Sequence, residues 1–237
     1  MEYIIFDQSN IDKYITNNKK LGSFVKSKHS GHNLSDYFRY VIDQYENLPD
    51  IIRFIKGNIV PRHCDKEYFL ANIKNNYFTG LYNEKLKNKL IFSRAQPGLV
   101  VESNIINIFR GKKKCIYFQT CNGLLKFLFK DPVYPTFIPF IPGGCFIIEK
   151  ERILKYPRSF YELLYYLVTY THFPQEAYIV ERLLFTIFHA NYKLSDDPQN
   201  LLKIIKSADR ILDKTEFQLR LNVLFKLSKF LNVWKKI

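Results

Sequence analysis

Polar and charged side chains gather in two predicted loops, and their chemistry suits a phosphate or a sugar hydroxyl. The first loop opens a predicted helix and carries Gly31, Asn33 and Asp36. Backbone N–H groups at the start of a helix lack partners within the helix, and they attract anions. The second loop follows a predicted strand and carries Lys56, Asn58, Arg62 and His63. A simpler interpretation is that Asn33 or Ser35 caps the helix and that His63 is an ordinary surface histidine.

The short motifs of most familiar enzymes are absent. The sequence contains no GxxxxGK[ST] loop, and the pair Gly143 and Gly144 does not form a GxGxxG fingerprint. HExxH, GxSxG and zinc-deaminase patterns are missing as well. The four cysteines are widely spaced and have no matching histidines, which argues against a structural zinc site or a disulfide framework. The missing glycine-rich motifs exclude P-loop and Rossmann-type enzymes.

Alternating apolar patterns predict the elements that hold these loops. Short β-favouring runs predict strands at 3–6, 22–27, 50–58 and 145–150. Helical spacing predicts helices at 34–48, from about 65, and at 122–132, 157–170 and 175–192. This alternation is typical of an α/β fold, in which ligands bind beyond the carboxyl ends of the strands. We therefore expect one α/β domain with a central mixed sheet flanked by helices.

The charge favours an anionic partner. The 237 residues include 36 Lys and Arg against 22 Asp and Glu, a formal net charge of +14. Nucleic acid, a nucleotide diphosphate and an acidic membrane surface all fit this balance, and so does an AT-rich coding bias. The amino-terminal residues do not resemble a signal peptide, and no apolar run reaches the 18 to 20 residues, roughly, that span a bilayer. We expect a cytoplasmic protein.

The last 40 residues differ in composition from the rest of the chain. From residue 198 on, lysines and arginines outnumber acidic residues, and leucines recur at helical spacing. This pattern predicts a basic amphipathic helical extension over 198–237, following a domain over 1–197. The extension either docks on an anionic leaflet, which would make the protein peripheral at the inner face of a membrane, or packs on the domain with its lysines in water.

Three segments between residues 30 and 188 carry a further pattern. The first supplies Tyr37, Tyr40, Ile42, Tyr45, Leu48, Pro49, Asp50, Phe54, Gly57, Pro61 and His63. The second supplies Gly143, Gly144, Phe146, Ile148, Lys150, Ile153, Pro157, Phe160, Tyr161 and Leu164. The third supplies Glu176, Tyr178, Glu181, Arg182 and Phe188. In this order and spacing they resemble glycosyltransferase-like domains with a GT-A-type fold, many of them of uncharacterised function in bacterial and viral glycan synthesis.

The resemblance implies a nucleotide-sugar donor, whose leaving diphosphate must be neutralised. Lys56, Arg62 and His63 lie at the end of a predicted strand and would supply positive charge in place of a metal ion. Many GT-A enzymes bind Mn²⁺ or Mg²⁺ through an Asp-x-Asp motif, which this sequence lacks. Adjacent Asp196 and Asp197 fit a loop before a proline better. Alternatively, one of three other aspartates holds a metal without that motif: Asp36, Asp50 or Asp65.

An inverting transferase also needs a carboxylate that removes the proton of the acceptor hydroxyl. The resemblance implies Glu176 or Glu181 for this role, with Glu176 preferred, because both precede or enter an apolar helix. The competing interpretation pairs Glu181 with an arginine or a helix N-terminus as structural support. Gly143 and Gly144 would form the acceptor side, where a backbone without side chains leaves room for a sugar.

The leading hypothesis is a glycosyltransferase that moves a sugar from a nucleotide-sugar donor to a glycan or lipid-linked acceptor, in surface polysaccharide or glycoconjugate synthesis. One alternative is a nucleic-acid-binding protein that uses Lys and Arg with interleaved Tyr and Phe. It is less favoured, because the aromatic residues fall at core spacing and no RRM, KH or zinc module is visible. Another alternative is an inactive GT-A-like protein that only binds a glycan.

Overall fold

The structure is a computed structural model, and it describes residues 4–7, 23–27, 32–83, 117–118, 120–133, 141–172, 174, 176–208 and 212. Two sets of predictions lie outside these ranges: the donor-loop glycine Gly31 and most of the basic extension beyond residue 208. Within the described part of the chain, no helix is both long enough and apolar enough to cross a membrane.

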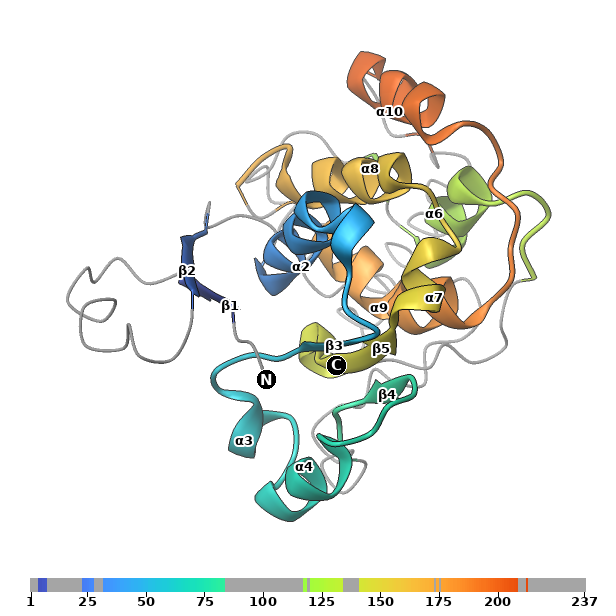
Figure 1. The fold of residues 1–237 in the computed structure, drawn as a ribbon. Coiled ribbons are helices and arrows are strands. Elements are labelled where there is room, and N and C mark those ends of the chain that lie inside the picture. Colours follow the sequence, from blue (N-terminus) through green and yellow to red (C-terminus); the bar gives the residue numbers. More distant parts are fainter. Residues whose placement is uncertain are drawn as a thin grey trace, which may run out of the picture.

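A small antiparallel sheet forms the centre of the described fold. Its strand order is β3–β5–β4, with bounds Ile51–Phe54, Phe146–Glu149 and Thr79–Gly80. The register pairs Ile51 with Glu149 and Phe54 with Phe146. A separate parallel pair, β1 (Ile4–Asp7) and β2 (Ser23–Lys26), lies beside helix α2 (Figure 1). The α/β class is thus confirmed, and the described strands form two sheets, one antiparallel and one parallel.

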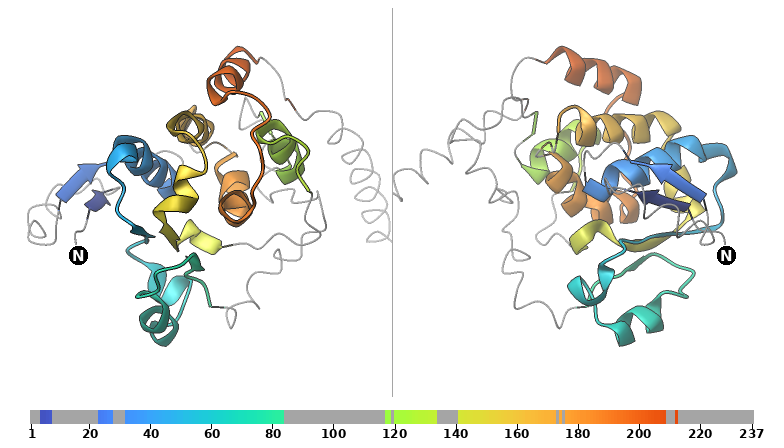
Figure 2. Two further views of the ribbon diagram at one scale, coloured as in Figure 1. Left: turned by 45° about the vertical axis from the view of Figure 1, so that its right-hand side comes forward. Right: turned by 90° about the vertical axis from the view of Figure 1, so that its left-hand side faces the viewer.

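Helices cover both faces of the antiparallel sheet (Figure 2). The larger layer contains α2 (His32–Asp43), α6 (Cys121–Leu128), α7 (Lys150–Leu154), α8 (Arg158–Thr169) and α9 (Glu176–His189). Helix α10 (Pro198–Ser207) stacks on α8, on the side away from the sheet (Figure 1). The smaller layer contains α3 (Ile59–Arg62) and α4 (Lys66–Asn72). The predicted helices at 122–132, 157–170 and 175–192 correspond to α6, α8 and α9.

The middle strand, β5, is buried on both faces because its side chains alternate between two cores. Phe146 and Ile148 pack into the larger core with α2, α8 and α9. Cys145, just before the strand, and Ile147 pack into the smaller core, whose other buried members are Ile59, Cys64 and Leu81. The start of β5 is therefore the place where the two layers meet.

Helix starts follow the local sequence. The Asp65 side chain accepts a hydrogen bond from the Tyr68 backbone N–H at 2.7 Å and caps α4. Pro157 precedes α8 as its N-cap residue, one position before the expected first turn. Its φ of −65° suits entry into a helix, so a proline at either position leaves no helical hydrogen bond unmade.

Candidate functional site

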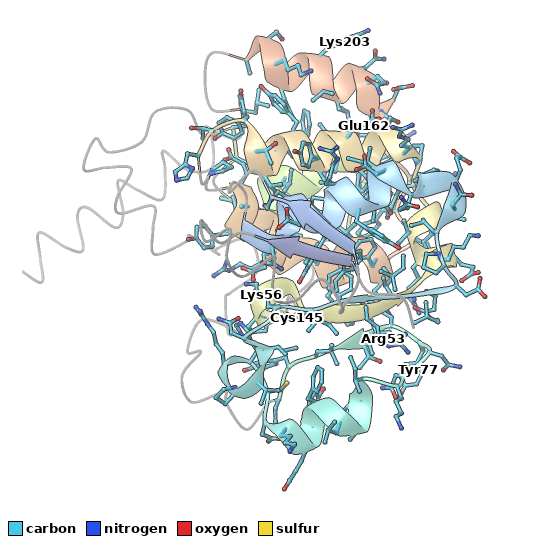
Figure 3. The ribbon with its side chains drawn as sticks, turned by 60° about the vertical axis from the view of Figure 1, so that its left-hand side comes forward. Arg53, Lys56, Tyr77, Cys145, Glu162 and Lys203 are labelled. Carbon is cyan, nitrogen blue, oxygen red and sulfur yellow. The ribbon has the colours of Figure 1, made fainter. Side chains whose placement is uncertain are left out.

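The chain after β3 and the chain before β5 meet at one edge of the antiparallel sheet. Phe54 ends β3 and pairs with Phe146, the first residue of β5. Lys56 and Cys145, which follow and precede these residues, consequently lie together at this edge, between the large helical layer and α3 (Figure 3). We call this group of side chains and backbone the β5-entry cluster: Asn33, Tyr37, Lys56, Arg62, His63, Gly143, Gly144, Cys145 and Glu181.

Two glycines shape the turn that enters β5. Gly143 has φ +81° and Gly144 has φ +60°, a region of backbone conformation that side chains with a Cβ rarely adopt. A Cβ on Gly143 would lie 2.6 Å from Nε2 of His63, and a Cβ on Gly144 would lie 3.2 Å from the Leu34 side chain. Both positions therefore require glycine, and the close approach that the sequence suggested for a sugar is made here by His63.

Asn33 ties the start of α2 to this turn. Its side-chain amide donates a hydrogen bond to the carbonyl oxygen of Gly143 at 2.9 Å. Asn33 does not cap the helix, because α2 already begins at His32. The predicted donor residue and the predicted acceptor residue are thus in direct contact, although 110 positions separate them in the sequence.

The cluster holds two cations, Lys56 and Arg62, beside His63, and one carboxylate, that of Glu181. Neither Lys56 nor Arg62 forms an ion pair with any residue of the described chain. His63 is half-buried, and its Nε2 atom is buried without a hydrogen-bond partner. Burial, followed by the charges of Lys56 and Arg62, lowers the pKa of His63 from 6.5 to about 4, so its imidazole is neutral at pH 7. This electrostatic environment disfavours a further cation and favours an anion.

Two further members of the cluster, Tyr37 and Cys145, were not among the site residues expected from the sequence, although Tyr37 belongs to the pattern of the first segment. Tyr37 is buried in the helical pattern of α2, and its hydroxyl lies near the side chains of Asn33 and Cys145 without a well-formed hydrogen bond. Burial raises the pKa of the Cys145 thiol, and the nearby Glu181 carboxylate adds to that rise. Both residues have the spacing of ordinary core positions, so only the fold reveals their place beside the glycine turn.

Glu176 lies apart from the β5-entry cluster and makes structural contacts. The residue is 0% exposed, and its Oε1 accepts hydrogen bonds from the backbone N–H groups of Tyr117 and Phe118. Its Oε2 accepts one from the Tyr170 hydroxyl at 2.8 Å. Burial raises the pKa of Glu176 from 4.5 to about 7, despite these donors. The geometry favours a role in holding residues 117–118 against α9 over the predicted role as catalytic base.

Glu181 points elsewhere because five residues turn an α-helix by about 140° beyond a full circle. It is half-buried on α9, close enough to Cys145 to raise the pKa of that thiol. Of the two predicted carboxylates, the structure therefore brings Glu181 to the cluster and leaves Glu176 outside it.

The remaining predicted donor residues differ in their surroundings. Asp36 is buried, and its carboxylate accepts a hydrogen bond from the Ser27 hydroxyl at 2.7 Å, which fixes the end of β2 to α2. Asn58 is exposed and precedes α3 without a side-chain cap. Arg62 is exposed beside His63. Asp36 and Asn58 thus lack the contacts to the glycine turn that Asn33 and His63 make.

The aspartates considered as metal ligands do not converge. Asp36 bonds to Ser27, Asp65 bonds to Tyr68 and to the side chain of Asn83, and Asp50 is exposed. Across the ranges that the structure covers, no group of three or more His, Cys, Asp or Glu side chains is placed to hold a metal ion. The residues that surround the glycine turn fit an anion through Lys, Arg and His instead.

Comparison with known proteins identifies a family but no activity. Residues 5–201 match the family described as "Protein of unknown function (DUF3431)". No curated protein and no solved structure matches the chain. The matched range contains both strands that form the site edge, the glycine turn and the described helices from α2 to α9, and so covers every member of the β5-entry cluster. The chain therefore belongs to the DUF3431 family.

Proposed function

We propose that the protein is a glycosyltransferase of GT-A type that binds the diphosphate of a nucleotide-sugar donor at the β5-entry cluster and transfers the sugar to a glycan or lipid-linked acceptor. The observation that carries this proposal is the positive charge of Lys56 and Arg62 at the strand edge. Lys56 and Arg62 have no ion pair among the described residues, and they flank a histidine that lacks a partner for Nε2.

The position of these cations supports an anionic substrate group. They follow β3 at the edge of the sheet where β5 begins, and the first turn of α2 reaches the same place through Asn33. In a transferase, Lys56 and Arg62 would stabilise the negative charge that develops on the leaving diphosphate.

Glu181 is the carboxylate that we assign to the acceptor. Among the two predicted bases it is the one that lies in the cluster, and it is half-buried rather than fully enclosed. Deprotonation of an acceptor hydroxyl requires a carboxylate that a sugar can reach, a requirement that Glu176 at 0% exposure does not meet in this conformation. Gly143 and Gly144 would form the wall beside it.

The proposal is tested with the full chain and a panel of UDP-, GDP-, CMP- and dTDP-sugars, with and without Mn²⁺. A donor at 100 times its Kd would stabilise the fold by about 2.7 kcal/mol, which a thermal-shift assay detects. Lys56→Gln is expected to weaken this binding at least tenfold. Lys203→Gln is the matched control, since Lys203 is exposed on α10 at the far side of the molecule (Figure 3).

Turnover is measured as hydrolysis of the donor, in which water receives the sugar; UDP-, GDP- and dTDP-sugars release the nucleoside diphosphate, and CMP-sugars release CMP. Glu181→Gln is expected to abolish release while donor binding persists, because the amide cannot accept the acceptor's proton. The proposal would be refuted if the protein neither bound nor cleaved any of the donors, with or without Mn²⁺. Unchanged turnover in Glu181→Gln would refute the assignment of the base alone.

A further inference from the structure

We propose that His63 takes up a proton when the β5-entry cluster binds a diphosphate group, so that anion binding and protonation are coupled at this site. This inference rests on the proposed function, because the diphosphate is that of the donor. It goes further in assigning His63 a change of state: neutral in the free protein, and cationic in the complex.

The geometry explains why His63 resists protonation in the free protein. Its Nε2 edge lies against Gly143, and this nitrogen has no hydrogen-bond partner. The carbonyl oxygen of Gly143 already accepts from Asn33 at 2.9 Å and faces the Cys145 thiol at 3.6 Å. Protonation would therefore bury a positive N–H without an acceptor, which is costly in a protein interior.

The charged and titratable neighbours of His63 favour the neutral state as well. Lys56, before α3, and Arg62, within it, both lower the pKa of His63. On the side of the glycine turn the neighbouring group is the Cys145 thiol, with Glu181 of α9 beyond it. Towards α4 lie the buried thiol of Cys64 and the carboxylate of Asp65, whose oxygens already accept from Tyr68 and Asn83.

A bound diphosphate reverses this balance. Its two negative charges offset Lys56 and Arg62 and stabilise a positive imidazolium beside them, while Nε2 stays buried against Gly143. Opposite charge within 4–6 Å shifts a pKa by about 1–3, so the pKa of His63 is expected to rise from about 4 to between about 5 and 7. The folded complex then binds a proton that the free protein lacks, and affinity falls up to tenfold, roughly, per pH unit between these two values.

The pKa of His63 is measured by NMR of the histidine rings of the full chain, with the resonance assigned by its absence in His63→Gln. The probes are the tightest nucleotide diphosphate sugar of the panel and, separately, sulfate against chloride at equal ionic strength. Neither probe changes its phosphate or sulfate charge between pH 4.5 and 7, roughly, so proton uptake reports on the protein. Calorimetry in buffers of different ionisation enthalpy should give an uptake of about 0.4 to 0.9 proton near pH 5.

Two substitutions locate the effect. Arg62→Gln removes one of the two cations and is expected to raise the pKa of His63 in the free protein, which shrinks the shift caused by the ligand. Lys203→Gln, on the far side of the molecule, is expected to leave both values as they are in the unmodified protein. Arg62 is exposed, so this variant keeps the test decisive even if His63→Gln does not fold.

The outcomes separate this inference from the proposed function. A raised pKa of His63 with sulfate, together with no binding of any nucleotide sugar, would overturn the transferase and leave the proton-coupled anion site standing. Binding of a nucleotide sugar without any shift of the His63 resonance, or with full proton uptake retained in His63→Gln, would overturn the coupling. No response to either probe would refute both.

Discussion

Replacing Glu176 by Gln tests whether a fully enclosed carboxylate stabilises or destabilises this fold. Glu176 accepts hydrogen bonds from two backbone N–H groups and from the Tyr170 hydroxyl. Counting charge-assisted hydrogen bonds alone, the amide would cost about 1–2 kcal/mol, and more as the pH rises and the carboxylate ionises. The raised pKa of Glu176 predicts the opposite: relative to the unmodified protein, the Gln variant becomes more stable as the pH rises.

The sign follows from linkage. Burial raises the pKa of Glu176 from 4.5 to about 7, so the unfolded chain releases this proton at a lower pH than the folded protein does. Below about pH 4.5 the carboxyl group is protonated in both the folded and the unfolded state, so its ionisation does not change the free energy of unfolding. Between 4.5 and 7 the unfolded state binds fewer protons, and the free energy of unfolding falls as the pH rises. At about 1.36 kcal/mol per pKa unit, the loss amounts to about 3 kcal/mol at pH 7 and above.

Gln cannot ionise, so Glu176→Gln removes this loss. Measured by urea unfolding at a series of pH values, the variant should gain about 3 kcal/mol relative to the unmodified protein between pH 4.5 and 7. Taking this difference cancels the other titrating groups, and Glu151→Gln, at an exposed position on α7, is the control that should show no such gain. If the free energy of unfolding of the variant instead falls relative to that of the unmodified protein as the pH rises, the reasoning is refuted. The ionised carboxylate would then be a net stabiliser.

Three further predictions concern the glycine turn, its contact with α2, and the core side of β5. Gly143→Ala should lower the free energy of unfolding by about 2–3 kcal/mol, through the positive φ and the contact with His63, whereas Gly57→Ala, with open space around it, should change little; urea titration compares the two. Asn33→Ala should cost about 1–2 kcal/mol in the same titration, because the partner carbonyl of Gly143 is part-buried, and it should weaken donor binding. Ile148→Ala should cost about 2–5 kcal/mol, because this side chain is 0% exposed; retention of the original unfolding midpoint would contradict its place in the core.

The elements were largely predictable because each depends on a local pattern. Period-2 and helical spacing locate β3, β5 and the helices α2, α8 and α9 to within a few residues. The pairing of strands is a different matter, since β5 lies between β3 and β4 although both precede it in the chain. That order depends on which apolar faces bury one another, and no spacing within a single segment records it.

The candidate site was predictable in part for the same reason. Asn33, His63 and Gly143 were selected as residues beside helix starts and strand ends, and the antiparallel register brings them together. The interpretation of Glu176 depended on its place near the start of an apolar helix. Two of its three partners, Phe118 and Tyr117, are 58 and 59 positions away, so the sequence around Glu176 does not reveal the backbone bonds that enclose its Oε1.

The non-local pairing of β3 bears on how the chain is synthesised. Ile51 and its partner Glu149 are nearly a hundred positions apart, and β3 has no other partner among the described strands. At about 5–20 residues per second, a ribosome needs roughly 5–20 s to make the intervening chain. During that interval β3 has an open edge and two apolar residues, Ile52 and Phe54, without their final cover. Until β5 is made, β3 is therefore a defined segment for chaperones to protect. Products of messages truncated ahead of residue 146 lack β5, so their β3 keeps its open edge.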